Sequence, residues 1–112
     1  MSTSLYAKYL QERTNDEILE FTYGFVSYRF LSDDKVFITD IYVLPEKRHQ
    51  GIARQMAAQV EALAKKRGCT QLLATVITSA KNSTDSIKVL LAYDMMLINS
   101  STDLIVFQKG LV

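Results

Sequence analysis

The sequence of 112 residues contains one cysteine and one proline, carries a formal net charge of +1, and has no long apolar run. A single cysteine excludes a disulfide framework within the chain and fits a reducing compartment. A membrane-spanning helix needs about 20 consecutive apolar residues, so we expect no membrane partner. The nearly balanced charge argues against nucleic acid as a partner. Because residues 1–4 lack the basic and apolar parts of a signal peptide, we predict a cytoplasmic protein.

Metal-ligand patterns, internal repeats and linkers are missing as well. His49 and Cys69 stand apart without partners at ligand spacing, so no metal site is predicted. Cys69 follows a predicted helix end and is expected to be a buried, inert thiol. The apolar content of 48% and charged content of 22% are typical of a globular chain. The length fits a single domain over residues 1–112.

Hydrophobic periodicity indicates the order of helices and strands. In chain order it predicts a helix over 4–12, one bent strand or two hinged strands over 17–31, a strand over 36–43, a helix over 51–67, a strand over 70–78, a helix from about 83 to 98 and a strand over 103–108. The strand, helix and strand between 36 and 78 form a βαβ unit, whose two strands should be parallel. A mixed sheet covered by helices satisfies these patterns.

The strand over 36–43 ends at Pro45, which has no N–H to donate to a sheet. Its connection to the preceding strand is short, so the two should form an antiparallel hairpin. Strict alternation places one set of side chains on one face of this strand and the other set on the opposite face. The first set is Val36, Ile38, Asp40 and Tyr42.

A short basic loop joins this strand to the helix that begins near Gly51. The residues before the glycine are Arg48, His49 and Gln50, and none of them is a good N-cap. Helix N-termini carry unsatisfied N–H groups and a partial positive charge, so a bound anion can replace the missing cap. The residues leave two interpretations open, an anion site or an ordinary strand-to-helix turn.

The segment from Val43 to Arg54 resembles the acetyl-CoA loop of the GNAT superfamily of N-acetyltransferases. That loop reads Arg/Gln-x-x-Gly-x-Gly/Ala, which here is Arg48-His49-Gln50-Gly51-Ile52-Ala53. The match gains specificity because a strand ending in Val-x-Pro precedes it and a helix of suitable length follows. The resemblance implies an α/β (α+β) fold with a mixed, mostly antiparallel sheet and helices on both faces.

The resemblance also implies a cosubstrate and the residues that hold it. The cosubstrate is acetyl-CoA, whose pyrophosphate would lie at the helix N-terminus, where a glycine lets the backbone approach closely. Val43 would pair its backbone with the pantetheine arm. The implied binding residues are Val43, Arg48, His49, Gln50, Gly51, Ile52, Ala53 and Arg54.

Two further residues receive catalytic roles from the same resemblance. The segment Tyr93-Asp94-Met95-Met96-Leu97 is similar to the Tyr-Glu-x-Leu-Gly-Phe segment of the family, so Tyr93 would protonate the leaving thiolate. Asp40 is the candidate general base or amine-binding carboxylate. The alternatives are a packed tyrosine on an amphipathic helix and a surface aspartate.

The sequence departs from the family pattern near its end. Leu97 and Ile98 stand where Gly-Phe is usual, Ser86 replaces an asparagine, and only one strand is predicted where the family has two. We therefore expect a C-terminally trimmed member whose open edge pairs in a homodimer. The implied function is acetyl transfer to a primary amine. The alternatives are a degenerate GNAT-fold protein that binds coenzyme A or another protein, and an unrelated α/β binding module.

Overall fold

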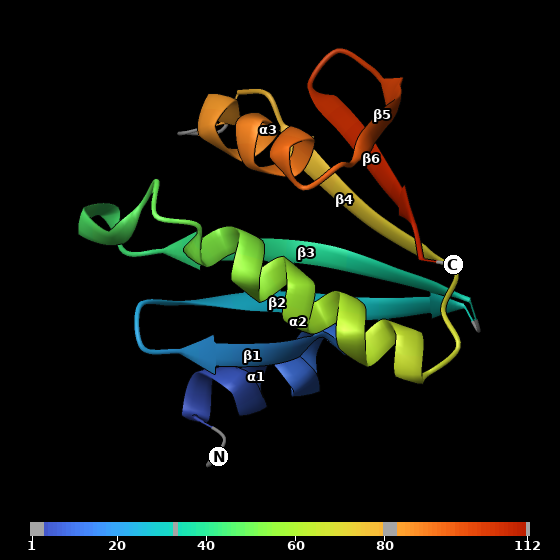
Figure 1. Cartoon of the computed structure of the whole chain (residues 1–112). Helices are drawn as coiled ribbons and strands as arrows, with labels where there is room; N and C mark the ends of the chain where they lie inside the picture. Colours follow the sequence, from blue (N-terminus) through green and yellow to red (C-terminus); the bar gives the residue numbers. More distant parts are fainter. Residues whose placement is uncertain (1–3, 33, 80–82, 112) are drawn as a thin grey trace.

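The computed structural model describes residues 4–32, 34–79 and 83–111, which form a six-stranded sheet with helices on both faces (Figure 1). In chain order the elements are α1 (Leu5–Thr14), β1 (Glu17–Phe21), β2 (Gly24–Ser32), β3 (Lys35–Val43), a 3-10 turn (Pro45–Lys47), α2 (Ile52–Lys66), β4 (Gln71–Ile77), α3 (Ser83–Ala92), β5 (Met96–Ser100) and β6 (Leu104–Gly110). Residues 17–31 were predicted to form one bent strand or two hinged strands. The structure shows two strands, joined by a turn just before Gly24. The predicted mixed, mostly antiparallel sheet is confirmed.

The strands lie in the order β1-β2-β3-β4-β6-β5, and only β3 and β4 are parallel. Their pairing is short, running from Lys35 opposite Gln71 to Ile38 opposite Ala74. Beyond this point β3 continues to Val43, still paired with β2, and β4 continues to Ile77, still paired with β6, but β3 and β4 no longer pair with each other and diverge in Figure 1. The C-terminal half of β3 therefore borders a gap in the hydrogen-bonded sheet, on the side where α2 begins.

A β-bulge in β3 overturns the predicted alternation of its side chains. Tyr28 of β2 pairs with Ile38 and Ser27 pairs with Asp40, so Thr39 is an extra residue without a partner of its own. One extra residue turns every later side chain to the other face. The prediction that Asp40 and Tyr42 share a face with Val36 and Ile38 is wrong, since both lie on the opposite face.

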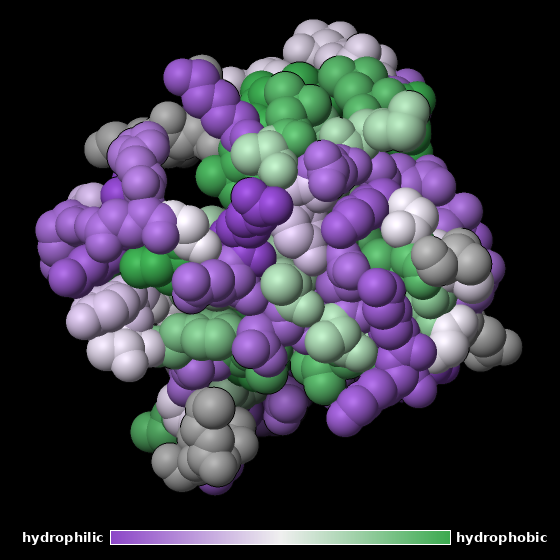
Figure 2. Space-filling model, viewed as in Figure 1, coloured by the Kyte–Doolittle hydropathy of each residue, from purple (hydrophilic) through white to green (hydrophobic). Residues whose placement is uncertain are grey.

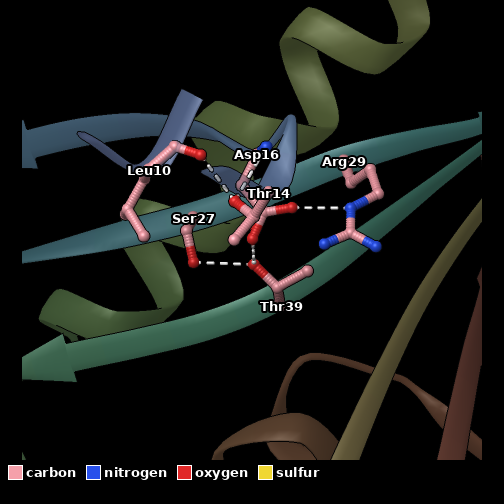
Figure 3. A network of polar contacts seen from close by, with 6 residues as sticks. All are labelled: Leu10, Thr14, Asp16, Ser27, Arg29 and Thr39. Atoms are coloured by element: carbon pink, nitrogen blue, oxygen red, sulfur yellow. Dashed lines mark hydrogen bonds and ion pairs between the residues drawn. The ribbon is translucent and has the colours of Figure 1, made fainter. Parts of the chain in front are cut away.

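Polar contacts fix this bulge to the junction of α1 and β1 (Figure 3). The carboxylate of Asp16 accepts hydrogen bonds from Arg29 Nε at 2.6 Å and from Thr39 Oγ1 at 3.2 Å. The hydroxyls of Thr39 and Ser27 lie 2.7 Å apart. Asp16 and Ser27 are both buried, and their polar atoms are satisfied within this network. The bulge is therefore held by contacts with β2 and with the junction between α1 and β1.

The core lies between the sheet and helix α2. The buried face of α2 carries Met56, Ala57, Val60 and Ala64, which pack with the buried residues of β3 and β4. Gly68, the glycine that directly follows the helix predicted over 51–67, has a φ of 90°. The N–H groups of Gly68 and Cys69 donate to the carbonyls of Lys65 and Ala64, the hydrogen bonds of a Schellman motif.

The C-terminal region differs from the prediction. Helix α3 ends at Ala92 instead of about Ile98, because Asp94 adopts a φ of 63° and closes the helix with the same Schellman bonds, from Asp94 and Met95 to Leu91 and Leu90. The residues that follow form β5, which pairs with β6 as an antiparallel hairpin. The prediction of a single strand after this helix is wrong, because the second strand is present.

Strand β5 is an edge of the sheet with an exposed apolar surface. Met96, Leu97 and Ile98 are each at least half exposed, and Figure 2 shows hydrophobic residues gathered at the top of the molecule, where β5 and β6 lie. A homodimer through the C-terminal strand stays a prediction. The sequence offers Ser83, Thr84 or Asp85 as the N-cap of α3, but their side chains, the side chain of Ser86 and all of Asn82 lie outside what the structure describes.

Candidate functional site

The N-terminus of α2 lacks a side-chain cap, as the sequence indicated. Gly51 is the N-cap residue, has a φ of 82° and provides no side-chain cap. The first N–H groups of a helix have no partner inside it, and within the described residues Ile52 and Ala53 donate to no other acceptor. A Cβ built on Gly51 would meet no protein atom within 4 Å. The backbone here is open to a ligand.

Basic side chains surround this N-terminus. Arg54 is exposed on the first turn of α2, and His49, with a φ of 65°, is exposed in the loop. Gln50 donates a 3.5 Å hydrogen bond to the carbonyl of Glu46. Ile52 and Ala53 pack against the core, so their contribution to a ligand would come from the backbone.

Arg48 lies against the end of β3. Its Nε donates to the carbonyl of Val43 at 3.0 Å, and its guanidinium carbon is 5.8 Å from the centre of the Tyr42 ring. Val43 is buried at the point where β3 has left β4. In this conformation Arg48 is hydrogen-bonded to the backbone carbonyl of Val43, the group that we expected to pair with a pantetheine arm.

Tyr93 lies at the end of α3 and points to α2. Its hydroxyl donates a 2.7 Å hydrogen bond to Glu61, and Lys109 of β6 donates to the same carboxylate oxygen at 2.8 Å. The Lys109 ammonium also lies 4.0 Å from the centre of the Tyr93 ring. Burial and the neighbouring carboxylate raise the pKa of the Tyr93 phenol, and the charge of Arg54 opposes this rise. The phenol therefore stays protonated at neutral pH and joins three elements.

Glu61 makes folding stability sensitive to acid. Partial burial alone would raise its pKa, but hydrogen bonds from Lys109, Tyr93 and Lys65 outweigh burial and lower the pKa to about 2. A carboxylate with a lowered pKa in the folded state stabilises the protein above its unfolded pKa of about 4.5 and loses this contribution as the pH falls towards 2.

We expect the wild-type protein to lose about 2–3 kcal/mol more unfolding free energy than Glu61→Gln between pH 6 and pH 2.5. Denaturant unfolding of both proteins at several pH values measures this difference. Parallel curves for the two proteins would show that Glu61 is not the titrating group.

Asp40 lies just beyond the part of β3 that pairs with β4, on the face that carries α1. It is exposed at the surface, yet the surrounding strands withdraw enough water to raise the pKa of its carboxyl group, against a lowering hydrogen bond from the backbone of Ile41. A carboxylate with a raised pKa is better suited to accept a proton than an ordinary aspartate. Asp40 and Tyr93 come from opposite faces of the sheet.

A depression that no sequence pattern indicated lies at the turn between β1 and β2 and the end of β3. It has a volume of about 330 Å³, and its lining includes Glu20, Phe21, Tyr23, Phe25 and Tyr42. These residues are scattered over three strands and one turn, and only the hairpin register and the bulge bring them together. The alternation of side chains within any single strand therefore could not predict that these residues line one depression.

Other candidates for chemistry are absent from the described residues. Cys69 is buried as expected, and burial raises the pKa of its thiol. No group of three or more His, Cys, Asp or Glu side chains in the described ranges is placed to hold a metal ion. None of the helices described is long and apolar enough to cross a membrane.

Comparison with known proteins identifies the family of the chain. The model of the acetyltransferase (GNAT) family matches residues 7–90. Thialysine N-epsilon-acetyltransferase of Bos taurus is 35% identical over 71 residues, which cover 63% of this chain and 42% of the relative. The same enzyme of Sus scrofa is 37% identical over 60 residues, covering 54% of this chain and 35% of the relative. The chain thus spans less than half the length of either relative.

Solved structures with the same fold include two with coenzyme A or acetyl-CoA bound. Paia N-acetyltransferase from Thermoplasma acidophilum, in complex with coenzyme A, has a TM-score of 0.74 at 17% identity and covers 90% of this chain and 65% of its own. A GNAT family acetyltransferase from Elizabethkingia anophelis with acetyl-CoA bound also has a TM-score of 0.74 at 17% identity, covering 97% of this chain and 83% of its own. The fold, the geometry at the start of α2 and the family match agree, and the chain belongs to the GNAT acetyltransferase family.

Proposed function

We propose that this chain is an N-acetyltransferase that transfers an acetyl group from acetyl-CoA to a primary amine by direct attack. The observation that carries this proposal is the N-terminus of α2, with its uncapped N–H groups and the open space above Gly51. The two relatives named for acetyl transfer to thialysine support an amine as the acceptor.

The residues around Gly51 fit the pyrophosphate of coenzyme A. The N–H groups of Ile52 and Ala53 point along the helix axis towards open space, and the helix dipole adds a partial positive charge. Arg54 on the first turn and Arg48 in the loop add two full charges. His49 and Gln50 complete the loop that we assign to the phosphates.

The unpaired end of β3 fits an extended arm. Beyond Ile38 this strand has no hydrogen-bonded neighbour on the side of β4, so its backbone groups are available to a strand-like ligand. Val43 lies at the end of this stretch. Arg48 must leave the Val43 carbonyl before that group can pair with a ligand, and a phosphate gives the guanidinium a charged alternative.

Asp40 and Tyr93 are the residues to which we assign the proton transfers. Bound acetyl-CoA supplies the activated carbonyl carbon and a thiolate leaving group. Asp40 holds the incoming ammonium and takes its proton, which its raised pKa favours. Tyr93 keeps a proton on its phenol oxygen for the leaving sulfur. Holding the amine and the thioester close together in the gap between β3 and β4 provides the largest contribution to the rate enhancement.

A second function, a binding module without catalysis, is favoured by one observation. The Tyr93 hydroxyl donates to Glu61, and the raised pKa of the phenol makes proton donation to a thiolate unfavourable in this conformation. A chain that keeps this bond would bind coenzyme A, or a protein partner, without turning over the thioester.

Two measurements on the same sample separate these functions. Calorimetric titration should show binding of acetyl-CoA, and release of free thiol with a panel of primary amines should show turnover. Binding with turnover supports the enzyme, and binding without turnover across the panel supports the module. A folded sample that does not bind acetyl-CoA at millimolar concentration contradicts the enzyme and the coenzyme A-binding module, and leaves only binding of a protein partner.

A further inference from the structure

Glu61 on α2 is contacted by three side-chain donors at its two carboxylate oxygens. One oxygen, Oε1, accepts hydrogen bonds from the Tyr93 hydroxyl at 2.7 Å and from the Lys109 ammonium at 2.8 Å. The other oxygen, Oε2, lies 3.1 Å from the ammonium of Lys65, one turn further along the same helix. The side chain of Glu61 is only 16% exposed, so water can replace a lost donor only in part. Tyr93 and Lys109 are thus two donors to a single oxygen atom.

The position of Lys109 at this oxygen is fixed by the sheet. Lys109 of β6 pairs with Leu72 of β4, which is buried in the core beneath α2, so both side chains lie on the face of the sheet that carries α2. The Lys109 ammonium lies 4.0 Å from the centre of the Tyr93 ring. Turning the phenol hydrogen about its C–O bond moves neither the ring nor Lys109. The ammonium therefore keeps its place whichever way the hydroxyl points.

The proposed reaction requires the Tyr93 hydroxyl to change its acceptor from Glu61 to sulfur. As the amine nitrogen bonds to the acetyl carbon and the C–S bond breaks, the phenol proton passes to the sulfur, and water later returns a proton to the phenolate. During this exchange Glu61 Oε1 loses the donor that Tyr93 provides. A partly buried carboxylate oxygen without a donor is unfavourable, but Lys109 still donates to it.

Resting on the proposed acetyl transfer, we propose that Lys109 is a positioning residue that acts through Glu61. It keeps the carboxylate hydrogen-bonded while the Tyr93 hydroxyl turns to the leaving sulfur, and it thereby makes the phenol proton available. Lys65 does not have this role, because it contacts the other oxygen and its side chain is 52% exposed, where ion pairs contribute little. Without Lys109, Glu61 would retain the hydroxyl, and the chain would bind the thioester without turning it over.

Unfolding equilibria test this exchange of donors without any turnover. Tyr93→Phe is introduced into the wild-type chain and into Lys109→Met, and denaturant unfolding gives the unfolding constant of each protein. Tyr93→Phe should raise this constant about 10-fold more in Lys109→Met than in the wild-type chain, because Oε1 then loses the second of its two donors. Lys65→Met is the matched control, and in that background Tyr93→Phe should have its wild-type effect.

Steady-state release of free thiol tests the role of Lys109 in the reaction. Lys109→Met should lower kcat about 10-fold and leave the KM for acetyl-CoA unchanged, whereas Lys109→Arg, which keeps a charged donor, should retain kcat within about threefold. Adding Glu61→Gln to Lys109→Met removes the charge that retains the hydroxyl. The kcat of this double variant should therefore return to within about threefold of that of Glu61→Gln alone. A purely structural role of Lys109 predicts no such recovery, since the double variant lacks two members of the network.

The outcomes separate this role from the proposed reaction. Equal effects of Tyr93→Phe in the wild-type and Lys109→Met backgrounds overturn the exchange of donors, whether or not the chain transfers acetyl groups. An effect in Lys65→Met as large as in Lys109→Met also overturns it, because the total charge beside Glu61 would then be the cause. A wild-type chain that releases no thiol contradicts the proposed enzyme, and the unfolding constants still decide whether Lys109 replaces the phenol at Glu61. A loss of kcat that Glu61→Gln does not restore contradicts the positioning role alone.

Discussion

Replacing Tyr93 with phenylalanine is expected to lower kcat for acetyl transfer about 100-fold, while the KM for acetyl-CoA stays the same. A positioned general acid contributes a factor of about 10²–10⁴, and the variant removes only the hydroxyl that holds the proton. Steady-state release of free thiol measures both constants. The unfolding free energy should also fall by about 1–3 kcal/mol, because Glu61 loses a donor in a largely buried position.

Glu61→Gln is the matched variant that separates catalysis from packing. It removes the charge that helps to raise the pKa of the Tyr93 phenol, so the phenol becomes a stronger acid. Stability should decrease as in Tyr93→Phe, whereas kcat should be kept or increased. If both variants lose stability and neither loses kcat, Tyr93 only joins α3 to α2, and the catalytic role that we assign to it is wrong.

Gly51→Val should weaken the binding of acetyl-CoA by about 100-fold or more. A β-branched residue at a φ of 82° is strained, and its side chain would occupy the space through which we expect the pyrophosphate to approach. Calorimetric titration gives the affinity. No protein atom lies within 4 Å of the Cβ position, so the valine side chain would not clash with the protein itself. It would instead fill the space that we assign to the pyrophosphate, and the loss of affinity should therefore exceed what backbone strain alone causes.

Gly68→Val is the control for this experiment. Gly68 has a φ of 90° at the other end of α2 and also has open space around its Cβ position. The two variants should lose similar folding stability, about 1–2 kcal/mol, from the left-handed conformation. Only the Gly51 variant should lose affinity. A similar loss of affinity in both would mean that destabilised protein, rather than a blocked phosphate site, causes the effect.

The loop and helix around Gly51 were predictable because their signals are local. A strand stopped by Pro45, a basic loop without a capping side chain and an apolar stripe ending at Gly68 all lie within one short segment. The βαβ order then determined that β3 and β4 are parallel, which the structure confirms. The cap, the turn and the period of the helix each depend on a few neighbouring residues.

The errors occurred where pairing between distant segments decides the structure. The apolar residues from Met95 to Ile98 continue the helical period of α3, but Asp94 takes the left-handed conformation, which is uncommon for residues other than glycine. Partnering with β6 then makes β5 a strand. The extra residue at Thr39 depends on contacts with Asp16 and Ser27, which no pattern within residues 36–43 contains.

The contact between Tyr93 and Glu61 could not be predicted for the same reason. Glu61 lies on the polar side of the predicted stripe of α2, where an acidic residue is usually solvated. Its partners Tyr93 and Lys109 come from α3 and β6, far along the chain. A sequence pattern can place each residue on its own element but cannot orient three elements to one another.

Because Thr39 is the extra residue of the bulge in β3, its presence alone determines on which face of the sheet Asp40 lies. Deletion of Thr39 would restore simple alternation and turn the last four residues of the strand over. Asp40 and Tyr42 would then lie beneath α2, and Ile41 and Val43 would face water. An insertion or deletion within this strand therefore has a different effect from one in the loop that follows it. A longer loop after β3 would leave Asp40 on the face that carries α1, but a length change at Thr39 would exchange the two faces of the strand end.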